Sequence, residues 1–316
     1  MVWIVLAACG DDPEPTGETG GTSSSTPTGE TGSTPTLPDS GSTPTGDTGE
    51  TPTIGTGSYL ALSAGEDLTC GLLGTGEVAC AGSTPWAMPP PPPGPFVAVA
   101  AAWDTGCAIR ESGEIACWGC DWLSDLCDAP SGSDWQAIDG SDSWFCATDS
   151  AGRASCWGLT YGWYDDPDVT YSAFAVGVTG FVGIRAADGH VVGAAEAGDL
   201  PGAHVEIGAG RSAVCGLSAV DGSTACVFLE VPDPPASGLV EIDGYDADFC
   251  WLDADSHVGC SRNVPDPARD GFDPAIETFV SVSAGATHAC AVTTDGRGFC
   301  WPRDGRPETS GMPERP

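Results

Sequence analysis

The chain has 316 residues, enough for one large domain or two small ones. It carries 45 acidic residues against 10 basic residues, all of them arginine, and its formal net charge is −35. Nucleic acid is therefore not an expected partner, because binding it depends mainly on cationic contacts to phosphate, and anionic membrane surfaces are disfavoured for the same reason. The plain interpretation of the charge is a solvated acidic surface.

The chain begins with the apolar stretch MVWIVLAAC, and Leu6 to Cys9 resemble a bacterial lipobox, which predicts lipidation at Cys9. A secretory signal also needs a charged region and a longer apolar core, so we expect a start codon assigned too late or a truncated record. The alternative is an apolar stub with a free thiol. The stretch is too short for a transmembrane helix, which needs about 20 apolar residues.

Residues 10–57 are rich in Thr, Pro, Gly and acidic residues, with imperfect TPTGE or TPTGD units and no basic residue. Such a segment buries too little apolar surface to offset its conformational entropy, so it is predicted to be a disordered tether. The expected organisation is a signal and lipobox segment over 1–9, the tether over 10–57 and a folded domain over 58–316.

From Tyr59 onward the sequence repeats about every 37 residues. Six copies contain two cysteines around a turn, and they begin at Cys70, Cys107, Cys146, Cys215, Cys250 and Cys290. A seventh copy, GIRAADGHVVG from Gly183 to Gly193, is interpreted as the same hairpin with glycine at both cysteine positions.

Each copy opens with an alternating stretch such as YLALSAG or FVSVSAG, which predicts a half-buried strand, and the cysteine hairpin adds two more strands. Antiparallel units of this size predict an all-β, seven-bladed β-propeller, with a linear β-solenoid as the alternative. One hypothesis for ring closure is that the strand at Tyr59 completes the last blade.

The segment VSVSAGATHACAVTTDGRGFCW, Val280 to Trp301, resembles the repeat of the regulator of chromosome condensation family. The matching positions are Ala284, Gly285, His288, Ala291, Val292, Asp295, Gly296 and Trp301, and Trp118-Gly119 and Trp157-Gly158 supply the ending in other copies. The resemblance spans about residues 58–302 and implies a propeller, within a bacterial lipoprotein subgroup. It implies no single function, because the family includes chromatin-bound exchange factors, a secreted inhibitor of β-lactamase and bacterial surface proteins.

Cysteines ten residues apart around a central turn face each other across a hairpin, within disulfide range. The predicted bonds join Cys70 to Cys80, Cys107 to Cys117, Cys146 to Cys156, Cys215 to Cys226, Cys250 to Cys260 and Cys290 to Cys300, with Cys120 to Cys127 closing a loop. Cys9 remains as the fifteenth cysteine. Metal binding is the alternative, but the usual ligand spacing for zinc is absent, so no metal and no cofactor are expected.

No catalytic constellation is found, because none of the four histidines lies near a nucleophile motif or in a metal spacing. The Asp-rich stretches at 139–143 and 243–248 are interpreted as turns and do not match a full calcium loop. Candidate ligand-binding residues are the loop aromatics and carboxylates Trp122, Tyr161, Trp163, Tyr164, Asp165 and Asp166, which could instead pack between blades.

The resulting hypothesis is a monomeric lipoprotein of the bacterial cell envelope that binds a protein or glycan and touches the membrane only through its lipid anchor. The first alternative is an enzyme, a polysaccharide hydrolase or lyase with carboxylates in the central funnel of the propeller. The second alternative is a purely structural envelope protein.

Overall fold

The computed structural model describes residues 58–82, 89–120, 124–159, 168–193, 200–211, 213–227, 234–246, 248–262, 265, 272–274 and 276–302. All of them belong to one of the two compact units into which the chain divides, the other unit comprising residues 11–53. Within the described ranges, no helix has the length and apolar character needed to cross a membrane.

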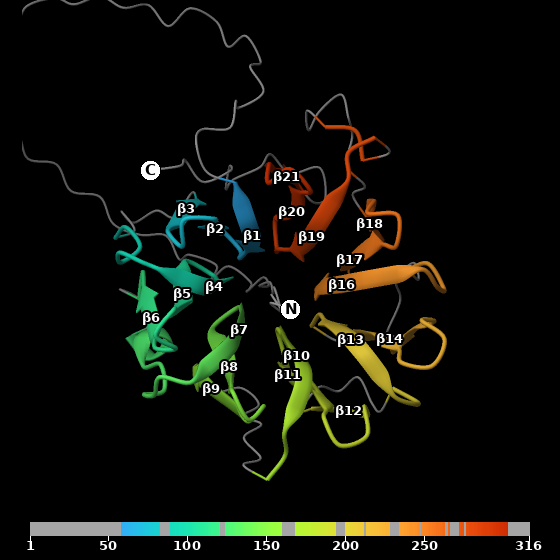
Figure 1. Ribbon diagram of the computed structural model, residues 1–316, viewed down its shortest axis with the longest axis horizontal. Coiled ribbons are helices and arrows are strands. Elements are labelled where there is room, and N and C mark those ends of the chain that lie inside the picture. Colours follow the sequence, from blue (N-terminus) through green and yellow to red (C-terminus); the bar gives the residue numbers. More distant parts are fainter. Residues whose placement is uncertain are drawn as a thin grey trace, which may run out of the picture. The chain divides into compact units, whose positions relative to one another are not determined.

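Seven three-stranded antiparallel sheets surround a common centre (Figure 1), which confirms the seven-bladed propeller over the solenoid. The strands, blade by blade, are β1 (Tyr59–Ala64), β2 (Leu68–Leu73), β3 (Val78–Gly82); β4 (Phe96–Ala102), β5 (Thr105–Arg110), β6 (Ile115–Trp118); β7 (Trp135–Ser141), β8 (Trp144–Asp149), β9 (Ala154–Gly158); β10 (Tyr171–Gly177), β11 (Gly180–Arg185), β12 (Val191–Gly193); β13 (His204–Ala209), β14 (Val214–Ser218), β15 (Thr224–Val227); β16 (Leu239–Tyr245), β17 (Asp248–Asp253), β18 (Val258–Cys260); and β19 (Phe279–Ala284), β20 (His288–Thr293), β21 (Gly298–Pro302). The first strand of each blade, which contains the alternating stretch, is the innermost (Figure 1).

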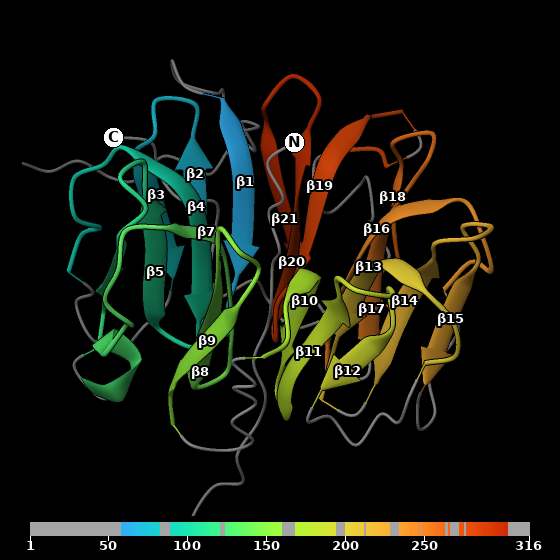
Figure 2. The same cartoon turned by 60° about the horizontal axis from the view of Figure 1, so that its bottom comes forward.

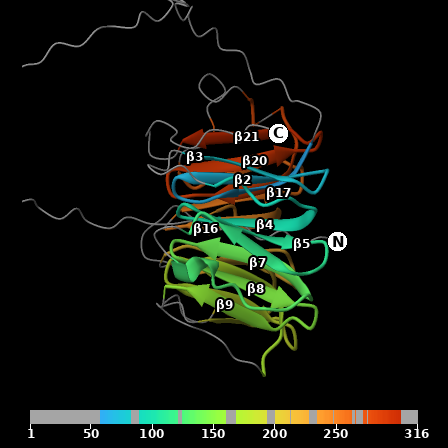
Figure 3. The same cartoon turned by 90° about the vertical axis from the view of Figure 1, so that its left-hand side faces the viewer.

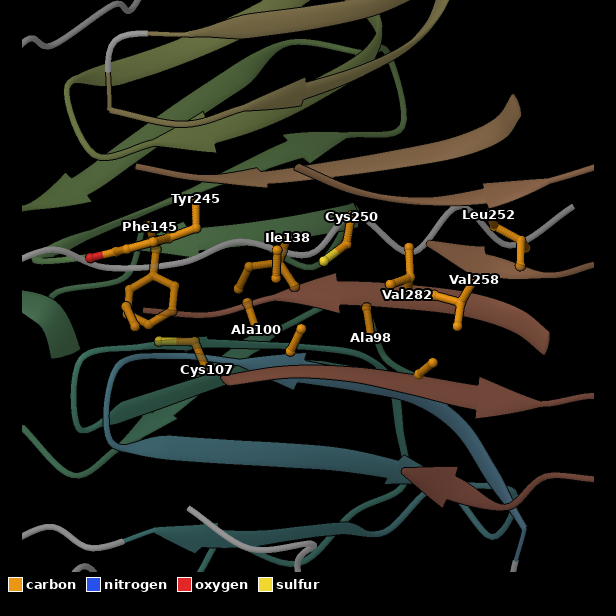
Figure 4. Packing of buried hydrophobic residues seen from close by; sticks show 14 of the residues in the cluster. Ala98, Ala100, Cys107, Ile138, Phe145, Tyr245, Cys250, Leu252, Val258 and Val282 are labelled. Atoms are coloured by element: carbon orange, nitrogen blue, oxygen red, sulfur yellow. The ribbon is translucent and has the colours of Figure 1, made fainter. Parts of the chain in front are cut away.

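The fourth residue of every inner strand is a large apolar residue that packs against the preceding blade. In chain order these residues are Leu62, Val99, Ile138, Phe174, Ile207, Ile242 and Val282, all at most 2% exposed. Leu62, for example, shares a cluster with Cys290 and Val292 of blade 7, and Figure 4 shows Ile138 and Val282 in the largest cluster. Burying one such side chain stabilises the fold by about 1.5–3 kcal/mol. Stacking of neighbouring blades therefore forms the core.

Disulfides join the partners predicted from the sequence. In the six hairpins the Cα atoms of the paired cysteines are 4.0–4.1 Å apart, and in the Cys120–Cys127 loop they are 5.8 Å apart. The longer turn between Cys215 and Cys226 leaves these two residues directly opposite each other. Each of the six hairpin bonds stays within one blade, so none of these six links neighbouring blades.

Blade 4 departs from the expected register. Val182, not Gly183, pairs with Gly193, and Val182 occupies the position that Cys70 holds in blade 1. The interpretation of Gly183 as a lost cysteine is therefore wrong, because the turn of blade 4 contains one more residue. A Cβ at Gly193 would lie 2.4 Å from the carbonyl oxygen of Phe181, so this strand pair excludes a cysteine there.

The tryptophans that end the repeats are structural. Trp118, Trp157 and Trp301 are at most 5% exposed. The indole Nε1 of Trp157 donates a hydrogen bond of 2.9 Å to the carbonyl oxygen of Leu126, which lies in the short 3₁₀ helix η1 (Ser124–Cys127). The Cys120–Cys127 loop is thereby packed onto blade 3.

The ring closes by packing of blade 7 against blade 1, whose strands lie next to each other in Figures 1 and 3. β1 pairs only with β2, so the hypothesis that the strand at Tyr59 completes the last blade is wrong. The buried Nε2 of His288 lies 2.7 Å from Oγ1 of Thr69, and the backbone nitrogen of Ala64 donates to Oγ of Ser283 over 3.0 Å. His288 is thus a closure residue, in agreement with its predicted structural role.

A further contact that closes the ring is one of a series of backbone hydrogen bonds between neighbouring blades, all on one face of the propeller. At six of the seven junctions, the first nitrogen of an inner strand donates to a carbonyl oxygen in the turn between the second and third strands of the preceding blade. The pairs are Phe96 to Gly76, Trp135 to Gly113, Tyr171 to Gly152, His204 to Gly189, Phe279 to Ser256 and Tyr59 to Gly296, over 2.6–3.2 Å. We call the face that carries these turns and the starts of the inner strands the turn face (Figure 2).

Candidate site on the turn face

Every inner strand has a register shift after its first residue, which makes its second residue a β-bulge. The seven bulge residues are Leu60, Val97, Gln136, Ser172, Val205, Val240 and Val280, and all seven are exposed. Because they occupy the same position in each blade, they form a ring on the turn face. We call this set the bulge ring.

Five consecutive blades place an aliphatic side chain in the bulge ring. Starting from blade 5, they are Val205, Val240, Val280, Leu60 and Val97, each 40–52% exposed. Single exposed aliphatic residues are ordinary, but a contiguous group marks an interaction site. We call these five residues the aliphatic arc; Gln136 and Ser172 of blades 3 and 4 interrupt it.

A cavity of about 630 Å³ lies where the arc is interrupted. It is lined by Val97, Gln136 and Ser172 of the bulge ring and by the aromatic residues Trp135 and Tyr171. The two aromatic side chains are at most 8% exposed, so their faces are not open for stacking on a sugar ring. The cavity therefore offers amide and hydroxyl groups, together with the charged residues Arg110, Glu111 and Asp149 in its lining.

The third residue of each inner strand directly follows the bulge residue and faces the following blade, as Glu241 does toward Val282 of blade 7. In chain order these residues are Ala61, Ala98, Ala137, Ala173, Glu206, Glu241 and Ser281. Only blades 5 and 6 carry a charge here, and both glutamates are half-buried. Burial raises the pKa of Glu206 to about 7, and burial together with the charge of Glu206 raises the pKa of Glu241 to about 8.

The fifth residue of four inner strands joins neighbouring blades by a hydrogen bond. Ser63, Asp139, Asp243 and Ser283 each accept from a backbone nitrogen of the following blade, over 2.6–3.0 Å. Asp139 and Asp243 also accept from the next nitrogen in their own strands. Burial raises the pKa of Asp139 to about 8 and holds the pKa of Asp243 well above its usual range.

These buried carboxylates bear on the enzyme alternative. Asp139 and Asp243 are at most 5% exposed and bind backbone groups of neighbouring blades, so they act as structural links, not as acids open to a substrate. The interpretation of their segments as turns holds for Asp142, Ser143 and Asp246 but is wrong for Asp139 and Asp243, which lie within inner strands. Aligning DGS and DGY with the SAG of the other copies would have identified them, since Ser63 occupies the same position.

The remaining candidate residues were Trp122, Tyr161, Trp163, Tyr164, Asp165 and Asp166, and all six lie outside the described residues, as does Cys9. Within the described ranges, no group of three or more His, Cys, Asp or Glu side chains is arranged to hold a metal ion. The bulge ring was not predicted from the sequence, although five of the seven inner strands have an aliphatic residue at the second position.

The last blade matches a known repeat. Residues 279–301 match the family model of the regulator of chromosome condensation (RCC1) repeat. Blade 7 is thus similar to an RCC1 repeat. The resemblance predicted for Val280 to Trp301 is thereby confirmed, and His288 and Trp301 of the matched segment are both buried.

Two solved structures share the fold around the RCC1 repeat. The CRINKLY WD40 ectodomain of the Arabidopsis thaliana receptor kinase ACR4 is 19% identical, with a TM-score of 0.66, covering 82% of this chain and 100% of that chain. The ectodomain of the Physcomitrella patens receptor kinase CR4 is 20% identical, with a TM-score of 0.64, covering 78% and 75%. A search of curated proteins finds no match to this sequence.

Proposed function

We propose that this chain is an extracytoplasmic binding propeller that docks a protein partner on its turn face. The observation that carries the proposal is the aliphatic arc, five exposed aliphatic side chains on consecutive blades. An apolar surface bordered by polar groups is typical of a protein interface. Val97 borders both the arc and the cavity at blades 2–4, so one partner could contact both.

The disulfides support the extracytoplasmic part of the proposal. Seven disulfides require an oxidising compartment, because cytosolic thiols are kept reduced. Propellers of this fold serve as receptor kinase ectodomains in the two plant proteins. We further propose lipidation at Cys9 and a flexible tether over residues 10–57, which would hold the monomeric propeller away from a bacterial envelope membrane.

A protein fits the site better than a glycan or a nucleic acid. The aromatic walls of the cavity are buried and cannot stack on a sugar, and the net charge of −35 opposes binding to phosphate backbones. The turn face thus favours a partner that contributes apolar side chains. This argument covers the described residues; Trp163 and its neighbours remain candidates for a further contact.

The triple variant Val205→Ser, Val240→Ser, Val280→Ser is expected to lose most of its partner binding, because it removes three adjacent members of the aliphatic arc. The full chain is immobilised, and captured envelope and secreted proteins of the source organism are compared by quantitative mass spectrometry. A partner of the wild type should fall by about tenfold or more with the triple variant.

The matched control is Val220→Ser with Ile276→Ser, two exposed aliphatic residues outside the arc, at 86% and 76% exposure. This control should capture as much partner as the wild type. A partner retained by the triple variant at wild-type level would contradict docking on the arc.

A further inference from the structure

The aliphatic arc carries two carboxylates on its inner side. Glu206 follows Val205 directly in β13, and Glu241 follows Val240 directly in β16. Oε1 of Glu241 lies 3.3 Å from the backbone nitrogen of Val282, so this side chain reaches across to blade 7. The turn face at blades 5–7 therefore combines exposed apolar side chains with two half-buried carboxyl groups beside them.

No cation within the described part of the chain neutralises these two glutamates. Five of its arginines form ion pairs with other acids: Arg153 with Asp149, Arg185 with Asp188, Arg211 with Asp246, Arg262 with Asp248, and Arg297 with Glu277 and Asp295. Arg110, the sixth, donates to the carbonyl oxygen of Pro93 and lies over the ring of Phe96. The charged groups that influence Glu241 and its neighbour Asp243 are themselves carboxyls, namely Glu206 and Asp139.

We propose that the partner inserts a lysine or arginine side chain, flanked by apolar residues, between the bulge residues of the turn face at blades 5–7. The aliphatic stem of the inserted side chain would pack on Val205, Val240 and Val280, and its cationic head would pair with Glu206 and Glu241. Long cationic side chains combine an apolar stem with a charged end in this way. This inference rests on the proposed docking face and specifies the chemistry of the partner.

Charge complementarity indicates that the inserted side chain is cationic. Two carboxylates close together in a partly desolvated site repel each other, and a cation between them removes that repulsion. An apolar occupant alone would instead bury both carboxyl groups without a counter-charge, which is costly. The strongly negative surface of the chain also steers cationic partners toward it.

The same geometry makes binding pH-dependent. Burial raises the pKa of Glu206 to about 7, and burial together with the charge of Glu206 raises the pKa of Glu241 to about 8, so both groups titrate in the neutral range. The ionised forms bind a cation, and these forms are lost as the pH falls below the pKa. Affinity is therefore expected to be higher at pH 8.5 than at pH 6.

A library of random peptides displayed on phage tests the inference without a known partner. The immobilised full chain is used for selection at pH 8.5, and the residues enriched among binders are counted. Wild type should enrich lysine or arginine beside apolar residues. The Glu206→Gln, Glu241→Gln variant should reduce the affinity of selected peptides by about tenfold or more, while apolar residues remain enriched.

The control for non-specific attraction is Asp221→Asn with Asp255→Asn, which removes two exposed turn carboxylates and so the same number of charges. If this control reduces cation enrichment as much as the glutamate variant does, general charge explains the selection and the inference fails. Selection of apolar peptides without a cation also overturns it, yet leaves docking on the arc intact. Peptides that bind the Val205→Ser, Val240→Ser, Val280→Ser variant as well as the wild type would instead contradict the proposed docking face.

Discussion

Lowering the pH from 8 to 5 is expected to raise the free energy of unfolding of the propeller. The pKa of Asp139 is about 8 in the folded chain and 3.8 ordinarily, because burial opposes its charge. A raised pKa stabilises the folded state fully below pH 3.8, and this contribution is lost as the pH rises through about 8. Glu206, Glu241 and Asp243 shift in the same direction, so their contributions to stability vary with pH in the same sense.

The Asp139→Asn variant isolates one of these groups. Its dependence of unfolding free energy on pH should be shallower than that of the wild type by about 1.4 kcal/mol per pH unit between pH 5 and 7. At pH 5 the variant should also be less stable, by about 1–3 kcal/mol, because both carboxyl oxygens of Asp139 accept backbone hydrogen bonds and an amide can accept with only one. Urea unfolding at several pH values measures both quantities.

Asp188→Asn is the matched control for this titration. Asp188 is exposed, and its bond to Arg185 lowers its pKa to about 2, so it does not titrate between pH 5 and 8. Its pH dependence in this range should equal that of the wild type. An equal slope for the wild type and Asp139→Asn would refute a protonated Asp139 at neutral pH.

Gly296→Ala is expected to destabilise the ring far more than Gly222→Ala. Both glycines have a positive φ, 83° and 66°, so alanine at either position introduces backbone strain of about 1–2 kcal/mol. A Cβ at Gly296 would also lie 2.1 Å from Cβ of Ser58 in blade 1, whereas a Cβ at Gly222 meets no atom within 4 Å. The clash would push apart the blades that the Tyr59 to Gly296 hydrogen bond joins.

The difference between the two variants measures closure of the ring. We expect Gly296→Ala to lose about 2 kcal/mol more of unfolding free energy than Gly222→Ala, counting the strained contact and the weakened hydrogen bond. Thermal or urea unfolding of both variants gives the comparison. Equal losses would show that the junction between blades 7 and 1 contributes little to stability.

Part of this structure was predictable because it is local. Cys290 and Cys300 face each other because ten residues with a central turn form a hairpin, and the same spacing occurs in four other blades. The same rule misplaced Gly183, where one extra turn residue brought Val182 opposite Gly193. Counting along a hairpin is reliable only while the length of the turn is known.

The site was less predictable, because it depends on residues from different blades. The apolar second residue of five inner strands is visible in the sequence, but alternation alone does not show that a β-bulge turns it toward solvent. Asp139 was interpreted as part of a turn, and only its bond to Val176 of blade 4 shows that it links two inner strands. The residue pattern within one strand does not show such contacts between strands of different blades.

The sequence by itself determined the number of blades, because the repeat recurs about every 37 residues, and the hairpins and disulfide partners, because their residues lie within about a dozen positions of one another. Only the tertiary structure decided how the ring closes, which side chains of neighbouring blades meet and which carboxyl groups are buried. These features depend on contacts between distant residues, such as Thr69 with His288, and on desolvation that arises only when seven blades surround a common centre.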